Sequence, residues 1–178
     1  MKPTLPTETE RLRFRAVTMG DVDEFLALHE DPLVARFMGA YDREGMVEWM
    51  QMGLDEWAER GHGRVVILDR ASGEFLGRTS LKHWPQFEET EVAWALRPEA
   101  RGKGFATEAG AASLRWGFEH FDLPRITAMI RPENTASVRI AERLGLYPQR
   151  TDTLLGEEVV VYAIGREEWG SRSHADYP

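Results

Sequence analysis

A basic, glycine-bearing segment in the middle of the chain carries the clearest chemical signal. It lies between an apolar run that ends at Leu96 and a stretch with apolar residues at helical spacing, and it reads Arg101-Gly102-Lys103-Gly104-Phe105-Ala106-Thr107. A strand, a glycine-rich turn and a helix N-terminus form an anion site, because free N–H groups and the helix dipole point at the anion. Gly102 and Gly104 allow close approach of the backbone, and Arg101 and Lys103 add positive charge. The segment therefore predicts a site for a diphosphate.

The order of residues separates this segment from two other phosphate-binding loops. A Walker A loop requires a lysine directly after its last glycine and then Ser or Thr, whereas Lys103 lies between the glycines and Phe105 follows them. A dinucleotide fingerprint requires a third Gly or Ala where this chain has Thr107. The segment matches the pattern R/Q-x-x-G-x-G/A instead. It resembles the acyl-CoA pyrophosphate loop of the GCN5-related N-acetyltransferase (GNAT) family.

Other segments extend this resemblance over most of the chain. The stretch from Asn134 to Leu146 resembles the family's later motif N-x-x-S…E-K/R-x-G-F/L, about thirty residues after the loop. The opening from Thr9 to Arg15 and the tail from Val159 to Trp169 resemble the first and last strands of the RimJ/RimL branch. We therefore expect a single GNAT domain over residues 7–170. Flexible termini are expected at 1–6 and 171–178.

Length and composition fit one globular domain outside any membrane. The chain has 178 residues, of which 42% are hydrophobic, and it has no cysteine. The absence of cysteine excludes disulfides, a thiolate metal site and an acyl-cysteine intermediate. The five histidines are scattered, so no metal site is expected. No apolar run reaches membrane-spanning length and the N-terminus lacks a secretory signal, so we expect a cytoplasmic protein without a membrane partner.

The net charge of −8 bears on the partners of the protein. Nucleic-acid binding requires a basic stripe, which the sequence lacks, so no nucleic-acid partner is expected. An acidic balance suits a cationic acceptor, although it also serves solubility alone. The acidic residues expected to ring the acceptor mouth are Glu88, Glu89, Glu91, Asp152, Glu157 and Glu158.

The hydrophobic pattern predicts strands first and then alternating strands and helices, which indicates an α/β or α+β class with a mixed sheet. Strands are expected at 11–17, 64–69, 74–81, 90–96, 125–130, 147–151 and 158–164. Helices are expected at 21–30, 32–38, 43–60, 104–120 and 134–144. The resemblance implies the GNAT fold, a mostly antiparallel twisted sheet of about seven strands with about four helices. In that fold the fourth and fifth strands splay apart and admit the pantetheine arm of the cofactor.

The resemblance also implies an acetyl-CoA site built mainly from backbone groups. The amides of residues 101–107 would bind the diphosphate. The main chain near Leu96 and Arg97 would pair with the pantetheine like an added strand and donate an N–H to the thioester oxygen. Asn134 resembles the family residue that binds the cofactor arm, and it is also a helix cap. Arg143 either reaches the adenosine phosphate or lies on a solvated face.

Two side chains are candidates for the proton transfers of acetylation. Glu91 matches the glutamate of the RimJ/RimL branch on the strand before the loop, and it is the candidate base. Glu89 shares its strand face and is the alternative. Ser137 matches the serine of the N-x-x-S motif, the suggested proton donor to the leaving thiolate in that branch. Tyr147 is the other candidate donor.

These residues lead us to expect an acetyl-CoA-dependent N-acetyltransferase that moves the acetyl group directly to a primary amine in a ternary complex. The acceptor would be the α-amine of a protein or a small-molecule amine such as a polyamine, an amino acid or an antibiotic. The alternative is a non-catalytic acyl-CoA-binding sensor module. Because the family often dimerises, both a monomer and a homodimer remain open.

Overall fold

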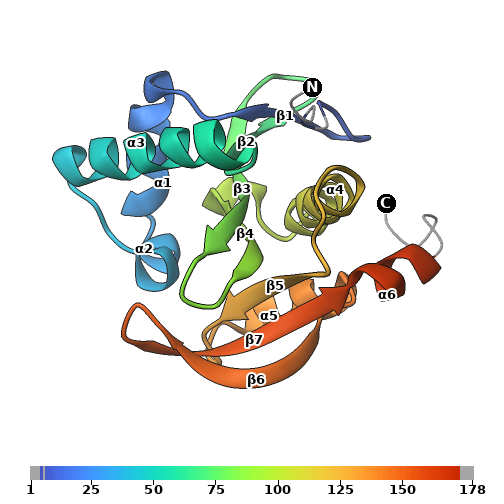
Figure 1. Ribbon diagram of the computed structural model, residues 1–178. Coiled ribbons are helices and arrows are strands. Elements are labelled where there is room, and N and C mark those ends of the chain that lie inside the picture. The colour runs from blue at the N-terminus through green and yellow to red at the C-terminus, as the bar shows by residue number, and fades with distance from the viewer. Residues whose placement is uncertain (1–4, 6, 173–178) are drawn as a thin grey trace.

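The protein is built around one twisted seven-stranded sheet (Figure 1). The computed structural model describes residue 5 and residues 7–172. The strands are β1 (Leu12–Ala16), β2 (Arg64–Asp69), β3 (Phe75–Trp84), β4 (Glu89–Leu96), β5 (Arg125–Ile130), β6 (Tyr147–Leu154) and β7 (Glu157–Gly165). Their order is β1-β2-β3-β4-β5-β7-β6, and every neighbouring pair is antiparallel except β4–β5. The predicted mixed, mostly antiparallel sheet is confirmed.

The described residues contain six α-helices, where the hydrophobic pattern predicted five and the resemblance implied about four. They are α1 (Val22–Glu30), α2 (Pro32–Met38), α3 (Arg43–Arg60), α4 (Phe105–His120), α5 (Thr135–Arg143) and α6 (Arg166–Ser171). The helix that the pattern missed is α6, which is six residues long. A helix of six residues is too short for its periodicity to stand out in the sequence. Most of the termini expected to be flexible, 1–6 and 171–178, lies outside the described residues.

Two antiparallel hairpins extend further than the sequence predicted. Strand β3 continues to Trp84, which pairs with Glu89 on β4, and β6 continues to Leu154, which pairs with Glu157 on β7. Polar residues near these strand ends obscure the alternation of apolar and polar residues in the sequence. The partner strand nevertheless supplies the backbone hydrogen bonds that extend each strand. The extension of β3 matters for the site, because it brings Trp84 alongside the start of β4.

The helices cover the two faces of the sheet in separate layers (Figure 1). Helices α1 to α3 pack on one face through a cluster that includes Phe25, Met46, Met50, Val66 and Phe75. Helix α4 packs on the other face through a larger cluster that includes Leu81, Val92, Trp94, Leu114 and Trp116. Full burial of such a side chain contributes about 1.5 to 3 kcal/mol, so the two layers fix β3 and β4 firmly between them.

The sheet opens between β4 and β5. These strands share a single register pair, Glu91 with Thr127, whereas β4 pairs with β3 along its whole length. Beyond that pair, the edge of β4 towards Leu96 no longer pairs with β5. The expected splay of the fourth and fifth strands is therefore present.

A buried carboxylate fixes the start of α4 against β1. Glu108 is 2% exposed, and it accepts hydrogen bonds from the Thr9 hydroxyl (2.6 Å), the Arg11 amide (3.0 Å) and Arg11 Nε (2.7 Å). Arg11 Nη1 in turn donates to the carbonyl of Lys103 (2.7 Å). The glycine-bearing turn before α4 is thus held from the far edge of the sheet.

We expect Glu108→Ala to lower the free energy of unfolding by about 2 to 3 kcal/mol, because three hydrogen bonds from partly buried donors on Thr9 and Arg11 to a buried, charged acceptor are lost. Urea unfolding followed by circular dichroism measures this change. Glu119→Ala, at an exposed position of the same helix, is the control and should change stability by less than about 0.5 kcal/mol. Equal stability of the two variants would contradict a stabilising role of Glu108 between α4 and β1.

Candidate active site

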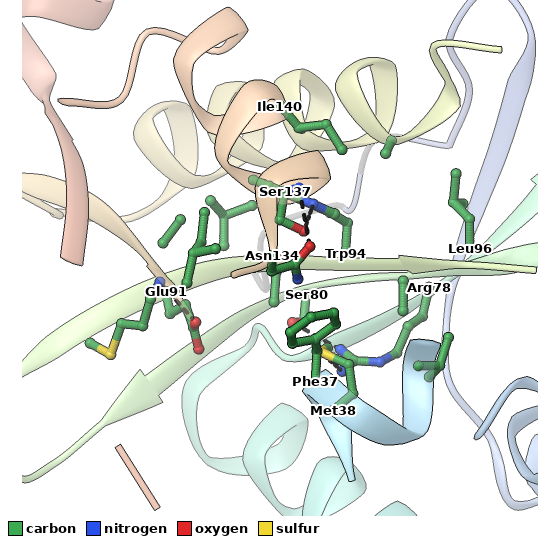
Figure 2. A pocket seen from close by; sticks show the side chains of 18 of the residues that line it. Phe37, Met38, Arg78, Ser80, Glu91, Trp94, Leu96, Asn134, Ser137 and Ile140 are labelled. Atoms are coloured by element: carbon green, nitrogen blue, oxygen red, sulfur yellow. Dashed lines mark hydrogen bonds between the residues drawn. The ribbon is translucent and has the colours of Figure 1, made fainter. Parts of the chain in front are cut away.

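A cavity of about 710 Å³ lies where β4 and β5 diverge (Figure 2). Its wall combines β3, β4 and β5 with α2, the glycine-bearing turn, and the first turns of α4 and α5. The two sequence motifs therefore lie on one cavity, although about thirty residues separate them along the chain.

The glycine-bearing turn presents backbone amides to this cavity. Gly102 and Gly104 have φ angles of +72° and +82°, in the left-handed region that favours glycine. Gly104 caps α4, and the first intrahelical bond runs from the Glu108 amide to its carbonyl (3.0 Å). The amides of Phe105, Ala106 and Thr107 precede that bond, so the helix leaves them without an acceptor. Gly102 and 104–107 all line the cavity, and this arrangement fits a phosphate.

Of the two basic side chains of the turn, Arg101 lines the cavity but is already paired, and Lys103 does not line it. Arg101 Nη2 forms an ion pair with Asp31 (2.5 Å) and donates to the Leu96 carbonyl (3.0 Å). The guanidinium holds the pKa of Asp31 below its usual value, so the pair is charged. Lys103 lies outside the cavity wall, and its carbonyl accepts from Arg11. Arg101 thus ties the start of α2 to the end of β4.

The open edge of β4 presents alternate peptide groups to the cavity. The Arg97 amide donates to the Leu76 carbonyl on β3 (2.9 Å), so the peptide groups of Trp94 and Leu96 face the gap. Leu96 lines the cavity as predicted, and Arg97 does not. The alternation of a strand explains the difference, because neighbouring residues direct their N–H groups to opposite edges.

Glu91 lies at the point where the strands separate. Its side chain lines the cavity and is largely buried, with the residue 8% exposed. Oε2 accepts from Trp84 Nε1 (2.6 Å), and Oε1 accepts from the Met129 amide (3.1 Å), which lies on β5 beyond the last strand pair. Burial raises the pKa of this carboxyl, although these two hydrogen bonds and the charges of Arg78 and Lys82 oppose the rise.

The alternative base, Glu89, is committed to other partners. It forms ion pairs with Arg125 and with Arg150 (Nη2 to Oε2, 3.0 Å), and it does not line the cavity. Burial alone would raise the pKa of Glu89, but the two guanidinium groups outweigh burial and lower it. Glu89 therefore remains ionised and out of reach of a bound acceptor.

The start of α5 brings Asn134 and Ser137 together on the cavity wall (Figure 2). The Asn134 side chain caps the helix as predicted, since Oδ1 accepts from the Ser137 amide (3.3 Å). The Ser137 hydroxyl accepts from Trp94 Nε1 (3.3 Å), which leaves its own proton available for donation. Arg143, two turns further along α5, also lines the cavity.

Tyr147, the other candidate proton donor, lies away from the cavity. It is 53% exposed, and its hydroxyl accepts from Arg172 Nη2 (3.1 Å). It forms no part of the cavity wall. Ser137 is therefore the hydroxyl from the sequence prediction that the fold brings next to β4.

The sequence reasoning did not identify the charged and polar side chains in the half of the cavity that faces α2 and α3. The residues there are Phe37, Met38, Tyr41, Trp49, Arg64, Arg78, Ser80, Lys82 and Trp84. Four of them alternate along β3, and Lys82 pairs with Glu91 in the β3–β4 register. Pairing the predicted strands around Glu91 would have placed the alternating β3 side chains on the same face.

The acidic ring expected around the acceptor mouth is not present. Of its six residues only Glu91 and Glu157 line the cavity, and Glu157 forms an ion pair with Arg131 (3.3 Å). Asp152 pairs with Arg150, as Glu89 does. Arginine side chains from neighbouring strands neutralise these carboxylates, which the sequence alone does not reveal.

Two further findings concern metals and membranes. Within the part of the chain that the structure describes, no group of acidic and histidine side chains is arranged to hold a metal ion. No helix in that part is both long enough and apolar enough to cross a lipid bilayer.

Comparison with known proteins agrees with this geometry. Residues 11–147 match the family described as acetyltransferase (GNAT) domain. The N-acetyltransferase p20 of Bacillus licheniformis, described as uncharacterized, is 30% identical over 140 residues, which are 76% of this chain and 79% of p20. A crystal structure of an acetyltransferase from Agrobacterium tumefaciens has a TM-score of 0.80 at 30% identity, covering 90% of this chain and 95% of that one.

The fold also matches the RimL ribosomal L7/L12 α-N-protein acetyltransferase, which was solved in complex with coenzyme A. That match has a TM-score of 0.75 at 19% identity and covers 90% of this chain and 97% of RimL, so it bears on the fold alone. The family match spans well over half of the chain and includes the glycine-bearing turn and the start of α5. The chain therefore belongs to the GNAT family and is an N-acetyltransferase.

Proposed function

We propose that the protein transfers an acetyl group from acetyl-CoA directly to a primary amine bound in the same cavity. One observation carries the proposal: a single cavity joins the amide cradle before α4 to the buried carboxylate of Glu91 along the unpaired edge of β4. The coenzyme A bound to RimL supports the same ligand here, since the two chains share the fold. A chain without cysteine has no thiol to carry the acetyl group, which favours direct transfer.

The cofactor would be held mainly by backbone groups. The amides of 105–107 and the left-handed glycines before them would bind the diphosphate. The peptide groups of Trp94 and Leu96 would pair with the pantetheine as an added strand would. One of these N–H groups would also bind the thioester oxygen as negative charge develops, a contribution of about 3 kcal/mol to the barrier. The amide nitrogen of Asn134 and the guanidinium of Arg143 would bind the arm and the adenosine end.

Two side chains would move the protons of the reaction. Glu91 would take the proton of the ammonium, directly or through water, and the free amine would attack the thioester carbon. The new C–N bond forms as the C–S bond breaks, and the Ser137 hydroxyl would donate its proton to the departing thiolate. The proton that the acylated nitrogen loses would return through water to Ser137, and Glu91 would release its own proton to solvent. A carboxyl whose pKa is raised by burial is a better base at neutral pH than an exposed one.

Turnover of acetyl-CoA tests this proposal. The purified chain is mixed with acetyl-CoA and a panel of amines, and the release of free thiol is followed with a thiol reagent. Amine-dependent release supports direct acetyl transfer. Binding of coenzyme A without amine-dependent release would favour the non-catalytic sensor instead.

We expect Gly102→Ala to raise the Kd for coenzyme A about tenfold, or about 1.4 kcal/mol, because a Cβ would stand where the diphosphate approaches. Isothermal titration calorimetry measures the affinity. Gly73→Ala is the matched control. Gly73 has a φ of +76° against +72° for Gly102, and a Cβ at either position meets no atom of the protein within 4 Å. Both variants carry the same backbone strain, so an equal loss of affinity would show that the turn around Gly102 does not bind the diphosphate.

We expect Glu91→Gln to lower kcat/KM by about tenfold or more near pH 7, with the loss shrinking as the pH rises and free amine becomes abundant. The protein with Glu91 should lose activity as the pH falls through a pKa above the ordinary value of 4.5. The cations that face this carboxyl, Arg78 and Lys82 on β3, keep that pKa from rising further. The Glu91→Gln variant should not show this loss of kcat/KM at low pH.

Glu157→Gln is the control for this experiment, because Glu157 lines the same cavity and carries the same charge. It should leave the pH profile of kcat/KM in place. An identical pH profile for Glu91→Gln and the unaltered protein would remove Glu91 as the base.

A further inference from the structure

The acceptor half of the cavity contains three cations that lack a carboxylate partner. Arg64, Arg78 and Lys82 all line the cavity, and Arg64 and Arg78 are 3% and 5% exposed. Among the residues that the structure describes, no Asp or Glu forms an ion pair with any of the three. Glu91 and Glu56 act on these cations only from beyond ion-pair distance. Burying a charge without a close counter-ion is costly, so an anionic ligand would complete this part of the site.

The guanidinium of Arg78 has only long contacts, including one of 5.3 Å to the ring centre of Trp49. Nη1 donates to the Ser80 hydroxyl at 3.4 Å, Nη2 lies 3.9 Å from the sulfur of Met38, and Nε is buried without any hydrogen-bond partner. Burial and the charge of Arg64 lower the pKa of Arg78 to about 10, so the group stays protonated at neutral pH. Arg78 therefore presents an ionised fork with spare donors to the cavity (Figure 2).

The other two cations lie closer to aromatic rings than Arg78 does. The Arg64 guanidinium lies 3.6 Å from the ring centre of Trp49 and donates to the Trp49 carbonyl (3.1 Å). Lys82 Nζ lies 4.2 Å from the ring centre of Trp84. These contacts satisfy part of each charge, whereas a planar fork such as that of Arg78 fits a carboxylate through two parallel hydrogen bonds.

The position of Arg78 relative to Glu91 sets the size of the ligand. The guanidinium reaches Ser80, which pairs with Ala93, and Ala93 is two residues from Glu91 on β4. Two residues of a strand span about 7 Å. A carboxylate on Arg78 and an amine beside Glu91 would therefore belong to one small molecule in which the two groups are a few bonds apart.

We propose that the acceptor is a free amino acid, with its carboxylate bound by Arg78 and its amine directed at Glu91. This inference rests on the proposed acetyl transfer and names the substrate class of that site. The apolar walls formed by Phe37, Tyr41 and Trp49 suit an amino acid with an apolar or aromatic side chain. A polyamine would place a second positive charge among three cations, and a protein N-terminus would place an uncharged peptide carbonyl opposite Arg78.

Paired substrates test the inference. Phenylalanine, leucine and methionine are each compared with their C-terminal amides in the thiol-release assay, with spermidine and a short N-terminal peptide as further acceptors. We expect kcat/KM to be about tenfold or more higher for each acid than for its amide, because only the acid forms the charge-assisted pair with Arg78. The amides have the lower amine pKa and are intrinsically more reactive, so this preference would have to come from binding.

The outcomes separate this inference from the proposed function. Acetylation of the amides, spermidine or the peptide in preference to the acids would overturn the amino-acid acceptor and leave acetyl transfer standing. The absence of thiol release with every amine would overturn both. A binding readout is independent of turnover: N-acetylphenylalanine, and not its amide, should raise the thermal unfolding temperature of the protein with coenzyme A bound.

Substitution of Arg78 gives the second test. We expect Arg78→Met to reduce the acid-to-amide ratio of kcat/KM to about one, mainly through a higher KM for the acid, while the KM for acetyl-CoA stays the same. Arg139→Met removes the same charge from an exposed position outside the cavity and should keep the preference. Should Arg78→Met fail to fold, Arg78→Lys keeps the charge but loses the fork, and it should still raise the KM for the acid. A preference that survives both Arg78 variants would overturn the inference.

Discussion

The end of strand pairing between β4 and β5 after Glu91 and Thr127 creates the conditions for every functional feature of the protein. An unpaired strand edge in the middle of a sheet needs other partners for its N–H and C=O groups, because buried backbone groups are rarely left without a hydrogen bond. The Glu91 carboxylate supplies one such partner by accepting from the Met129 amide across the gap. The edge of β4 that remains open lines the cavity, and in the proposed function it is the strand with which the pantetheine arm would pair. The split is thus both the entrance to the site and its binding surface.

The sequence predicted the backbone features around the glycine-bearing turn and the start of α5 because their requirements are local. Left-handed glycines, a helix start and a capping Asn134 each depend on neighbouring residues, and these are visible as a motif. The charge of Arg101 was visible too, but its partner Asp31 lies 70 positions earlier in the chain. The acceptor half depends on long-range contacts, since α2, α3 and β3 meet only when the sheet is assembled. Its residues could have been found only by pairing the predicted strands in the correct register around Glu91.

Net charge was a poor guide to the acceptor because it averages over the whole surface. The chain carries −8 overall, yet the acceptor half of the cavity holds three cations. Three residues of the expected acidic ring, Glu89, Asp152 and Glu157, are paired with Arg125, Arg131 and Arg150. Exposed charges are screened beyond about 8 Å at physiological salt, whereas buried charges are not. The few buried groups therefore decide which ligand charge is favoured.

Environment also separates two carboxylates that look equivalent in the sequence. Glu89 and Glu91 are two residues apart on one face of β4, but Glu89 meets two guanidinium groups, and Glu91 meets an indole N–H and one amide at close range. The first has a lowered pKa and the second a raised one. Burial acts in the opposite direction on Arg78, whose pKa falls. Burial thus disfavours the charged forms of both Glu91 and Arg78, while each charge favours the other. A zwitterion bound between them, with its carboxylate on Arg78 and its ammonium beside Glu91, would offset both penalties at once, which neither a polyamine nor a peptide amine can do.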